Sequence, residues 1–182
     1  MSMGELNDRK LISLVRGGDS SALDLLFERH YGTVYRIAWR FCGIQQDAED
    51  VAQEVFVKLV RKLSSFGGKS SFTTWLYRIV VNTALDFRRK SAATRFRHED
   101  YAEHRLRHNP SPSAGGNPID SEGIQAAIDK LPEKQKAAIL LVFGEGLSHR
   151  ETSRILGCPE VSVSWRIFQA RKKLRVYMEH PS

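Results

Sequence analysis

The side chains best suited to recognition chemistry gather near the C-terminus, over residues 147–178. Ser148 and Glu151 have the spacing of a capping box, in which each side chain accepts a hydrogen bond from the backbone N–H of the other residue. Gly157 favours the end of that helix, because the residue after a helix often takes a positive φ, and Pro159 is suited to start the next helix. The segment therefore predicts two helices joined by a short turn.

The second of these helices has two different faces. Trp165 and Phe168 fall opposite an apolar stripe and lie among lysines and arginines. Large aromatic side chains that face water beside cations indicate a contact surface. A helix-turn-helix whose second helix enters the major groove of DNA has this pattern, and a solvated amphipathic helix pair is the alternative. The stripe that we expect to be buried consists of Val163, Ile167, Ala170 and Leu174.

Histidines in the middle of the chain are the other candidate for chemistry. His98, His104 and His108 lie with Glu103 in a segment rich in proline and glycine, which favours a flexible linker. Their spacing matches no metal-binding signature, and no nucleophile, base or acid accompanies them. We therefore expect no metal, no cofactor and no catalytic centre, and a metal-dependent enzyme is the weakest of three functional hypotheses.

Composition favours a polyanionic partner. The 182 residues include 28 Lys and Arg against 21 Asp and Glu, a net charge of +7. Cys42 and Cys158 lie far apart and suggest reduced thiols rather than a disulfide scaffold. The first ten residues lack the apolar core of a signal peptide, and no apolar run approaches the roughly 20 residues of a membrane span. We expect a cytoplasmic protein.

Residues 6–90 carry apolar side chains at helical spacing throughout, which predicts a helical first domain. A pair of glycines ends the first helix, Ser20 or Ser21 can cap the second, and Gly43 ends the second. A third helix is predicted to start at Asp47.

The outer face of that third helix is acidic and polar, with Asp50, Gln53 and Glu54 on one side. A solvated surface is the ordinary interpretation of such a face. A docking site for a basic protein surface is the other.

The next loop and helix combine rings, cations and an amide. Phe66 lies in the loop 64–71, and Trp75, Arg78 and Asn82 lie on the helix predicted over 72–90. Rings that stack on bases, cations that bind phosphate and an amide that recognises a base edge suit single-stranded DNA. A core tryptophan beside a solvated arginine is the alternative.

Together these patterns predict an all-α protein of two small helical domains. We expect the first domain over residues 1–90, a flexible linker over 91–118 and a second domain over 119–182 that ends in the helix-turn-helix.

Three segments in this order resemble the extracytoplasmic-function sigma factors of the sigma-70 superfamily, which direct bacterial RNA polymerase to promoters. The segments are DAEDVAQEVFVKL, SSFTTWLYRIVVNTALDFRRK and IDKLPEKQKAAILLVFGEGLSHRETSRILGCPEVSVSWRIFQARKKL. The resemblance implies that the first binds the polymerase core enzyme, the second melts and recognises the −10 promoter element, and the third recognises the −35 element. It also implies a promoter-specificity subunit without a catalytic centre.

The resemblance assigns residues to each role. Asp50, Gln53 and Glu54 would bind the coiled coil of the largest polymerase subunit, and Phe66 and Asn82 would capture a flipped base. The full −10 set is Phe66, Trp75, Tyr77, Arg78 and Asn82. The −35 set is Ser164, Trp165, Phe168 and Gln169, with Arg166, Arg171 and Lys172 as phosphate contacts.

The resemblance further implies an anti-sigma factor as a partner, with Val57, Val81 and Leu85 as exposed contacts. The second functional hypothesis is a stand-alone helix-turn-helix repressor or activator whose first domain binds a ligand or dimerises. Basic charge and the second domain support it equally, but it gives no reason for the outward Asp50, Gln53 and Glu54.

Overall fold

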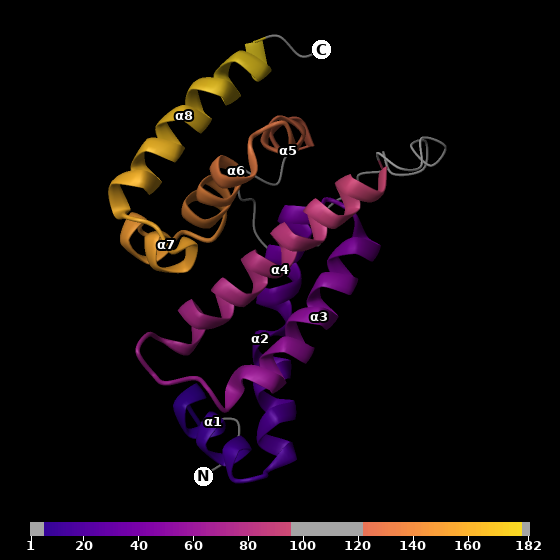
Figure 1. Cartoon of the computed structure of the whole chain (residues 1–182), viewed down its shortest axis with the longest axis vertical. Helices are drawn as coiled ribbons and strands as arrows, with labels where there is room; N and C mark the ends of the chain where they lie inside the picture. Colours follow the sequence, from indigo (N-terminus) through magenta and orange to yellow (C-terminus); the bar gives the residue numbers. More distant parts are fainter. Residues whose placement is uncertain (1–5, 96–121, 180–182) are drawn as a thin grey trace. The chain divides into compact units, whose positions relative to one another are not determined.

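The computed structural model describes residues 6–95 and 122–179, and over these residues it contains helices and no strand (Figure 1). The chain divides into two compact units, Met1–Thr94 and Arg95–Ser182. The predicted all-α fold is thereby confirmed. The histidines of the predicted linker lie outside the described residues.

Over its described residues the first unit contains four helices. The first packs against the second, and the second packs along the third. The fourth is hydrogen-bonded to the second and the third. Arg88 of the fourth helix donates to the backbone carbonyl of Phe41, and Lys58 of the third helix donates to the Thr83 hydroxyl. Their bounds are Asp8–Arg16 (α1), Ser20–Cys42 (α2), Gln45–Leu63 (α3) and Phe72–Arg95 (α4).

Local signals set the helix ends of this unit, with three corrections to the sequence prediction. Asp19, not Ser20 or Ser21, caps α2: its carboxylate accepts from the Ala22 N–H at 3.2 Å, while Ser20 is already helical. Gly43 ends α2 with a φ of 71°, as predicted.

The third helix also starts earlier than predicted. α3 begins at Gln45 rather than at Asp47, and Asp47 is buried in its first turn. α4 begins after Ser71, whose hydroxyl accepts from the Thr74 N–H, and it runs five residues beyond Lys90.

Over residues 122–179 the second unit contains four α-helices and one π-helical turn, and α6 and α7 both pack against α8. The capping box is confirmed, because the Ser148 hydroxyl accepts from the Glu151 N–H and the Glu151 carboxylate accepts from the Ser148 N–H. Gly157 adopts the left-handed conformation, with φ 61°, as predicted. The elements are α5 (Glu122–Asp129), α6 (Glu133–Ile139), the π-helical turn η4 (Leu140–Gly144), α7 (His149–Leu156) and α8 (Glu160–Glu179).

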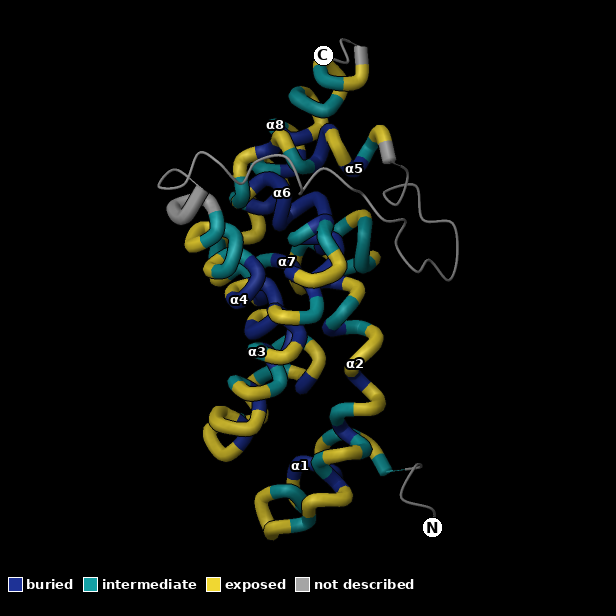
Figure 2. The backbone as a smooth tube through the Cα atoms, turned by 90° about the vertical axis from the view of Figure 1, so that its right-hand side faces the viewer, coloured by how far each residue is buried: buried dark blue, intermediate teal, exposed yellow. Residues whose placement is uncertain are grey.

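Each unit has its own buried core, and the residues that form it are dark blue in Figure 2. The second unit also buries a charge: Lys136 is 1% exposed and pairs with Asp129. This pair joins α5 to α6. None of the described helices is long and apolar enough to cross a membrane.

Candidate nucleic-acid and protein interfaces

The outer face of α3 is polar and open, as the sequence predicts. Asp50 and Gln53 are exposed, and Glu54 is half-buried with its carboxylate 2.8 Å from the ammonium of Lys58. Val57 continues this face by one further turn and is 49% exposed. Carboxylates beside an exposed apolar side chain can bind a basic protein surface through both charge and burial. We call these four positions, Asp50, Gln53, Glu54 and Val57, the α3 face.

Two of the three apolar contacts predicted for a partner differ from expectation. Val57 is exposed, but Val81 is only 1% exposed and Leu85 is half-buried. The exposure predicted for Val81 was wrong, because α4 is buried over more of its circumference than a single apolar stripe.

Three rings pack together where the loop 64–71 meets the start of α4. The Phe66 ring lies 5.1 Å from that of Trp75 and 5.8 Å from that of Phe72, centroid to centroid. Phe72 is 6% exposed, whereas Phe66 and Trp75 are half-buried. The aromatic cluster, Phe66, Phe72 and Trp75, therefore has one buried ring as a base and two rings that reach solvent.

Polar side chains extend this surface along α4. Trp75, Arg78 and Asn82 are spaced three and four residues apart, which places them on one side of the helix. Arg78 and Asn82 are exposed. Tyr77, the other residue assigned to the −10 element, is 8% exposed and does not share their surface. Stacking rings, a cation and an amide thus lie along one surface, and these are groups that can bind a single strand of nucleic acid.

The helix α8 presents its aromatic side chains to solvent. Trp165 is 59% exposed and Phe168 is 65% exposed, whereas Val163, Ile167 and Ala170 are buried. Trp165, Phe168 and Lys172 fall three and four residues apart on the open side. Of the stripe predicted from the sequence, Leu174 is half-buried.

Two polar contacts hold the start of α8. The Ser164 hydroxyl lies 2.9 Å from Nδ1 of His149 on α7, and the half-buried Arg166 guanidinium donates to the sulfur of Cys158 at 3.3 Å. Ser164 is exposed and Gln169 is half-buried. The first contact joins α7 to α8, and the second joins α8 to the turn between the two helices.

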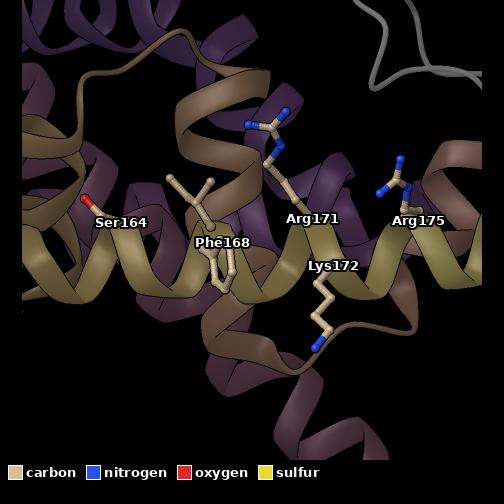
Figure 3. A pocket seen from close by; sticks show the side chains of 6 residues that line it. Ser164, Phe168, Arg171, Lys172 and Arg175 are labelled. Carbon is tan, nitrogen blue, oxygen red and sulfur yellow. The ribbon is translucent and has the colours of Figure 1, made fainter.

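Cations continue along α8 beyond the predicted set. A hollow on this helix is lined by Ser164, Phe168, Arg171, Lys172 and Arg175 (Figure 3). In that view Arg171 and Lys172 project to opposite sides of α8. Arg175 was not predicted as a contact, although its position four residues after Arg171 gave the signal. With no acid between residues 161 and 178, this surface suits a polyanion.

The hydrogen bonds of the capping box favour the ionised form of the Glu151 carboxylate. The pKa of Glu151 is lowered, first by the hydrogen bond from the Ser148 hydroxyl, then by the Ser148 backbone N–H and the charge of Arg154. The negative charge at the N-terminus of α7 also suits the helix dipole.

Comparison with known families places these surfaces in two matched segments. The sigma-70 region 2 family matches residues 26–94, and the sigma-70 region 4 family matches residues 121–174. The first segment contains the α3 face and the aromatic cluster, and the second contains the helix-turn-helix. α1 lies before both.

Relatives match over most of the chain. The RNA polymerase sigma-H factor of Pseudomonas aeruginosa is 35% identical over 176 residues, which cover 92% of this chain and 91% of the relative. The ECF RNA polymerase sigma-E factor of Escherichia coli is 36% identical over 182 residues, 93% of each chain.

Solved structures share the fold. CnrH in complex with the cytosolic domain of CnrY is similar with a TM-score of 0.68 and 25% identity, over 96% of this chain and 99% of that one. The sigma factor RpoE from Bartonella quintana, solved with the anti-sigma factor NepR, has a TM-score of 0.70 at 22% identity, over 86% and 96% of the two chains.

Proposed function

This chain belongs to the extracytoplasmic-function sigma factors of the sigma-70 family, and we propose that its two units divide promoter recognition between them. The first unit binds core RNA polymerase and holds the unpaired −10 strand, and the second binds the −35 element as duplex. The polymerase supplies the catalytic centre, and this chain supplies recognition in the cytoplasm.

The α3 face binds the polymerase. Asp50 and Gln53 are exposed, and Glu54 is half-buried beside Lys58, so the carboxylates of this face are accessible to a partner. Opposite charges across such an interface speed association and fix its register. Val57 adds apolar area to the same contact.

The aromatic cluster and the open side of α4 hold the −10 strand. Phe66 and Trp75 stack on bases, Arg78 binds phosphate and Asn82 recognises the edge of a flipped base. Tyr77 contributes to the packing of α4 rather than to the DNA contact, since it is buried.

The open side of α8 enters the major groove at the −35 element. Ser164, Trp165, Phe168 and Gln169 face base edges, and Arg166, Arg171 and Lys172 bind phosphates. The −35 assignment is carried by the large exposure of Trp165 and Phe168. The whole proposal is carried by the open α3 face, which a stand-alone regulator would not need.

A further partner of the proposal is an anti-sigma factor. Two structurally similar proteins were solved in complexes, one of them with a named anti-sigma factor. An inhibitor of this kind would cover the surfaces that the polymerase and DNA need.

Run-off transcription with core RNA polymerase tests the proposal. We expect the chain to bind the core enzyme and to initiate at a matched promoter. Asp50→Arg should weaken core binding at least about thirtyfold, because it sets a cation against a basic surface. Asp24→Arg, the same charge change at an exposed acid on α2, is the control and should bind as the unaltered chain does. Tight duplex binding by the free chain, with no affinity for core polymerase, would instead indicate a stand-alone regulator.

A further inference from the structure

The last residue of α1 contacts the loop that carries Phe66. One terminal nitrogen of the Arg16 guanidinium donates to the backbone carbonyl of Leu63 at 3.0 Å and to that of Ser64 at 3.3 Å, and it also donates to that of Phe66. These contacts span 47 to 50 residues of sequence. We call them the Arg16 clamp.

The clamp donates to backbone carbonyls at and just after the end of α3, where intrahelical donors are missing. The last carbonyls of a helix have no partner within the helix, and they carry the negative end of its dipole. Leu63 is the last residue of α3, and Ser64 and Phe66 follow it. A guanidinium satisfies such carbonyls through charge-assisted hydrogen bonds, which are stronger than neutral ones.

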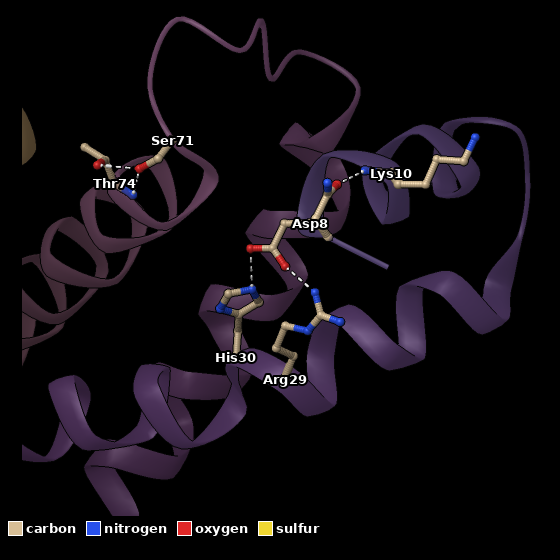
Figure 4. Close-up of polar contacts among 7 residues, drawn as sticks. Asp8, Lys10, Arg29, His30, Ser71 and Thr74 are labelled. Carbon is tan, nitrogen blue, oxygen red and sulfur yellow. Dashed lines mark hydrogen bonds and ion pairs between the residues drawn. The ribbon is translucent and has the colours of Figure 1, made fainter. Parts of the chain in front are cut away.

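The helix that bears the clamp is itself firmly placed. Leu11 and Ile12 of α1 are buried. Asp8 binds two residues of α2, with one carboxylate oxygen 2.8 Å from Arg29 and the other 3.0 Å from Nε2 of His30 (Figure 4). Arg16 therefore reaches the loop from a fixed base.

The clamp ends where the loop gains freedom. Gly67 and Gly68 follow Phe66, and Gly68 has a φ of 68°, which favours glycine. At the far side Ser71 caps α4 (Figure 4). Phe66 is thus the last residue on the clamped side, and its ring also rests on Trp75.

From this geometry we propose that Arg16 is a positioning residue for recognition of the −10 base. By holding the backbone at residues 63–66, it sets the place of the Phe66 ring before DNA arrives, which saves the ordering cost of binding. The inference rests on the proposed role of Phe66. It assigns a function to α1, which precedes both matched family segments.

A simpler role for Arg16 must be separated from this one. Arg9, Ser13 and Arg16 line a hollow with Phe66 and the two glycines. A phosphate in that hollow would be attracted by the charges of both Arg9 and Arg16. Of these two arginines, only Arg16 donates hydrogen bonds to the loop carbonyls. Arg9→Gln is therefore a matched control, since it removes the same charge from the same helix and the same hollow.

The experiment uses the full chain with core polymerase on a promoter that this holoenzyme transcribes. Each of the four bases is placed in turn at every −10 position of the non-template strand within a pre-opened bubble. The ratio of open-complex stability between the best and worst base is compared for the unaltered chain, Arg16→Gln, Arg9→Gln and Phe66→Ala. Amide exchange at Ser65 and Phe66 is measured on the same free proteins.

For Arg16→Gln we expect the ratio to fall about tenfold at one position, with core binding and −35 duplex affinity unchanged, and amide exchange in the loop to rise by a similar factor. Arg9→Gln should change the ratio less than about twofold. Equal losses in the two arginine variants, or faster exchange without lost discrimination, would overturn the positioning role. An unaltered ratio in Phe66→Ala would instead reject the proposed function of the loop.

Discussion

The two units present aromatic side chains in opposite ways. In the first unit Phe66, Phe72 and Trp75 pack on one another at the end of a loop. In the second unit Trp165 and Phe168 stand largely in solvent on a regular helix. The difference matches the form of DNA that each unit is proposed to bind, which is an unpaired strand for the first unit and a duplex for the second.

An intact duplex offers a groove of fixed width, so a rigid helix can carry exposed side chains into it without further preparation. An unpaired base has no fixed position and must be caught in a pocket that already exists. In keeping with this, the loop has rings packed beneath it and the Arg16 clamp behind it, whereas α8 has its buried stripe and two polar contacts, Ser164 with His149 and Arg166 with Cys158.

The largest expected effect comes from replacing one phenylalanine in each unit by alanine. Phe72→Ala should destabilise the first unit by about 3 kcal/mol, because it empties a buried site beneath two rings. Phe168→Ala should change the free energy of unfolding by less than about 0.5 kcal/mol, since its ring is exposed. Denaturant unfolding of the full chain, followed separately in each unit by amide exchange, measures both values. Equal destabilisation by the two variants would erase the contrast.

A second test separates two kinds of contact on α8. Trp165→Ala should lower −35 duplex affinity about tenfold and relax selectivity, because the ring faces base edges in the proposed complex. Lys172→Ala should weaken all duplexes alike and reduce the slope of affinity against salt by about one. Binding of labelled duplexes at several salt concentrations distinguishes them. Selectivity that changes with Lys172 but not with Trp165 would reverse the assignment.

The smallest expected effect concerns pH. The pKa of Glu151 is lowered in the folded protein, so its contribution to stability is complete above the unfolded pKa and is lost as the pH falls through the folded value. Thermal melting of the second unit should therefore lose part of its stability in acid, and Glu151→Gln should lack that part. A variant with the same acid response as the unaltered chain would show that other carboxylates govern it.

Local sequence signals predicted the helix-turn-helix well. The capping box at Ser148 and the left-handed Gly157 each depend on residues within one turn, so the sequence contains all the information they need. The exposure of Trp165 and Phe168 followed from helical periodicity for the same reason.

Features that depend on tertiary packing were not predicted from the sequence. The carboxylate of Asp19 caps α2 in place of the neighbouring serines, because residues 19, 20 and 21 are all good caps and packing chooses among them. Val81 was expected on the surface and is buried. The Arg16 clamp joins residues 47 to 50 positions apart, for which no local pattern exists. The DNA and polymerase roles of the assigned residues stay predictions.

The ion pair between Lys136 and Asp129 carries a consequence for how this protein can evolve. Lys136 is almost fully enclosed, so an isolated change at Asp129 would remove one charged partner of a buried cation. We expect natural variants to exchange these two positions jointly, for example for an apolar couple, and to avoid every intermediate in which only one has changed. Drift at this point of the second unit should therefore proceed in paired steps, while the exposed side of α8, which has no such buried pair, can change one residue at a time.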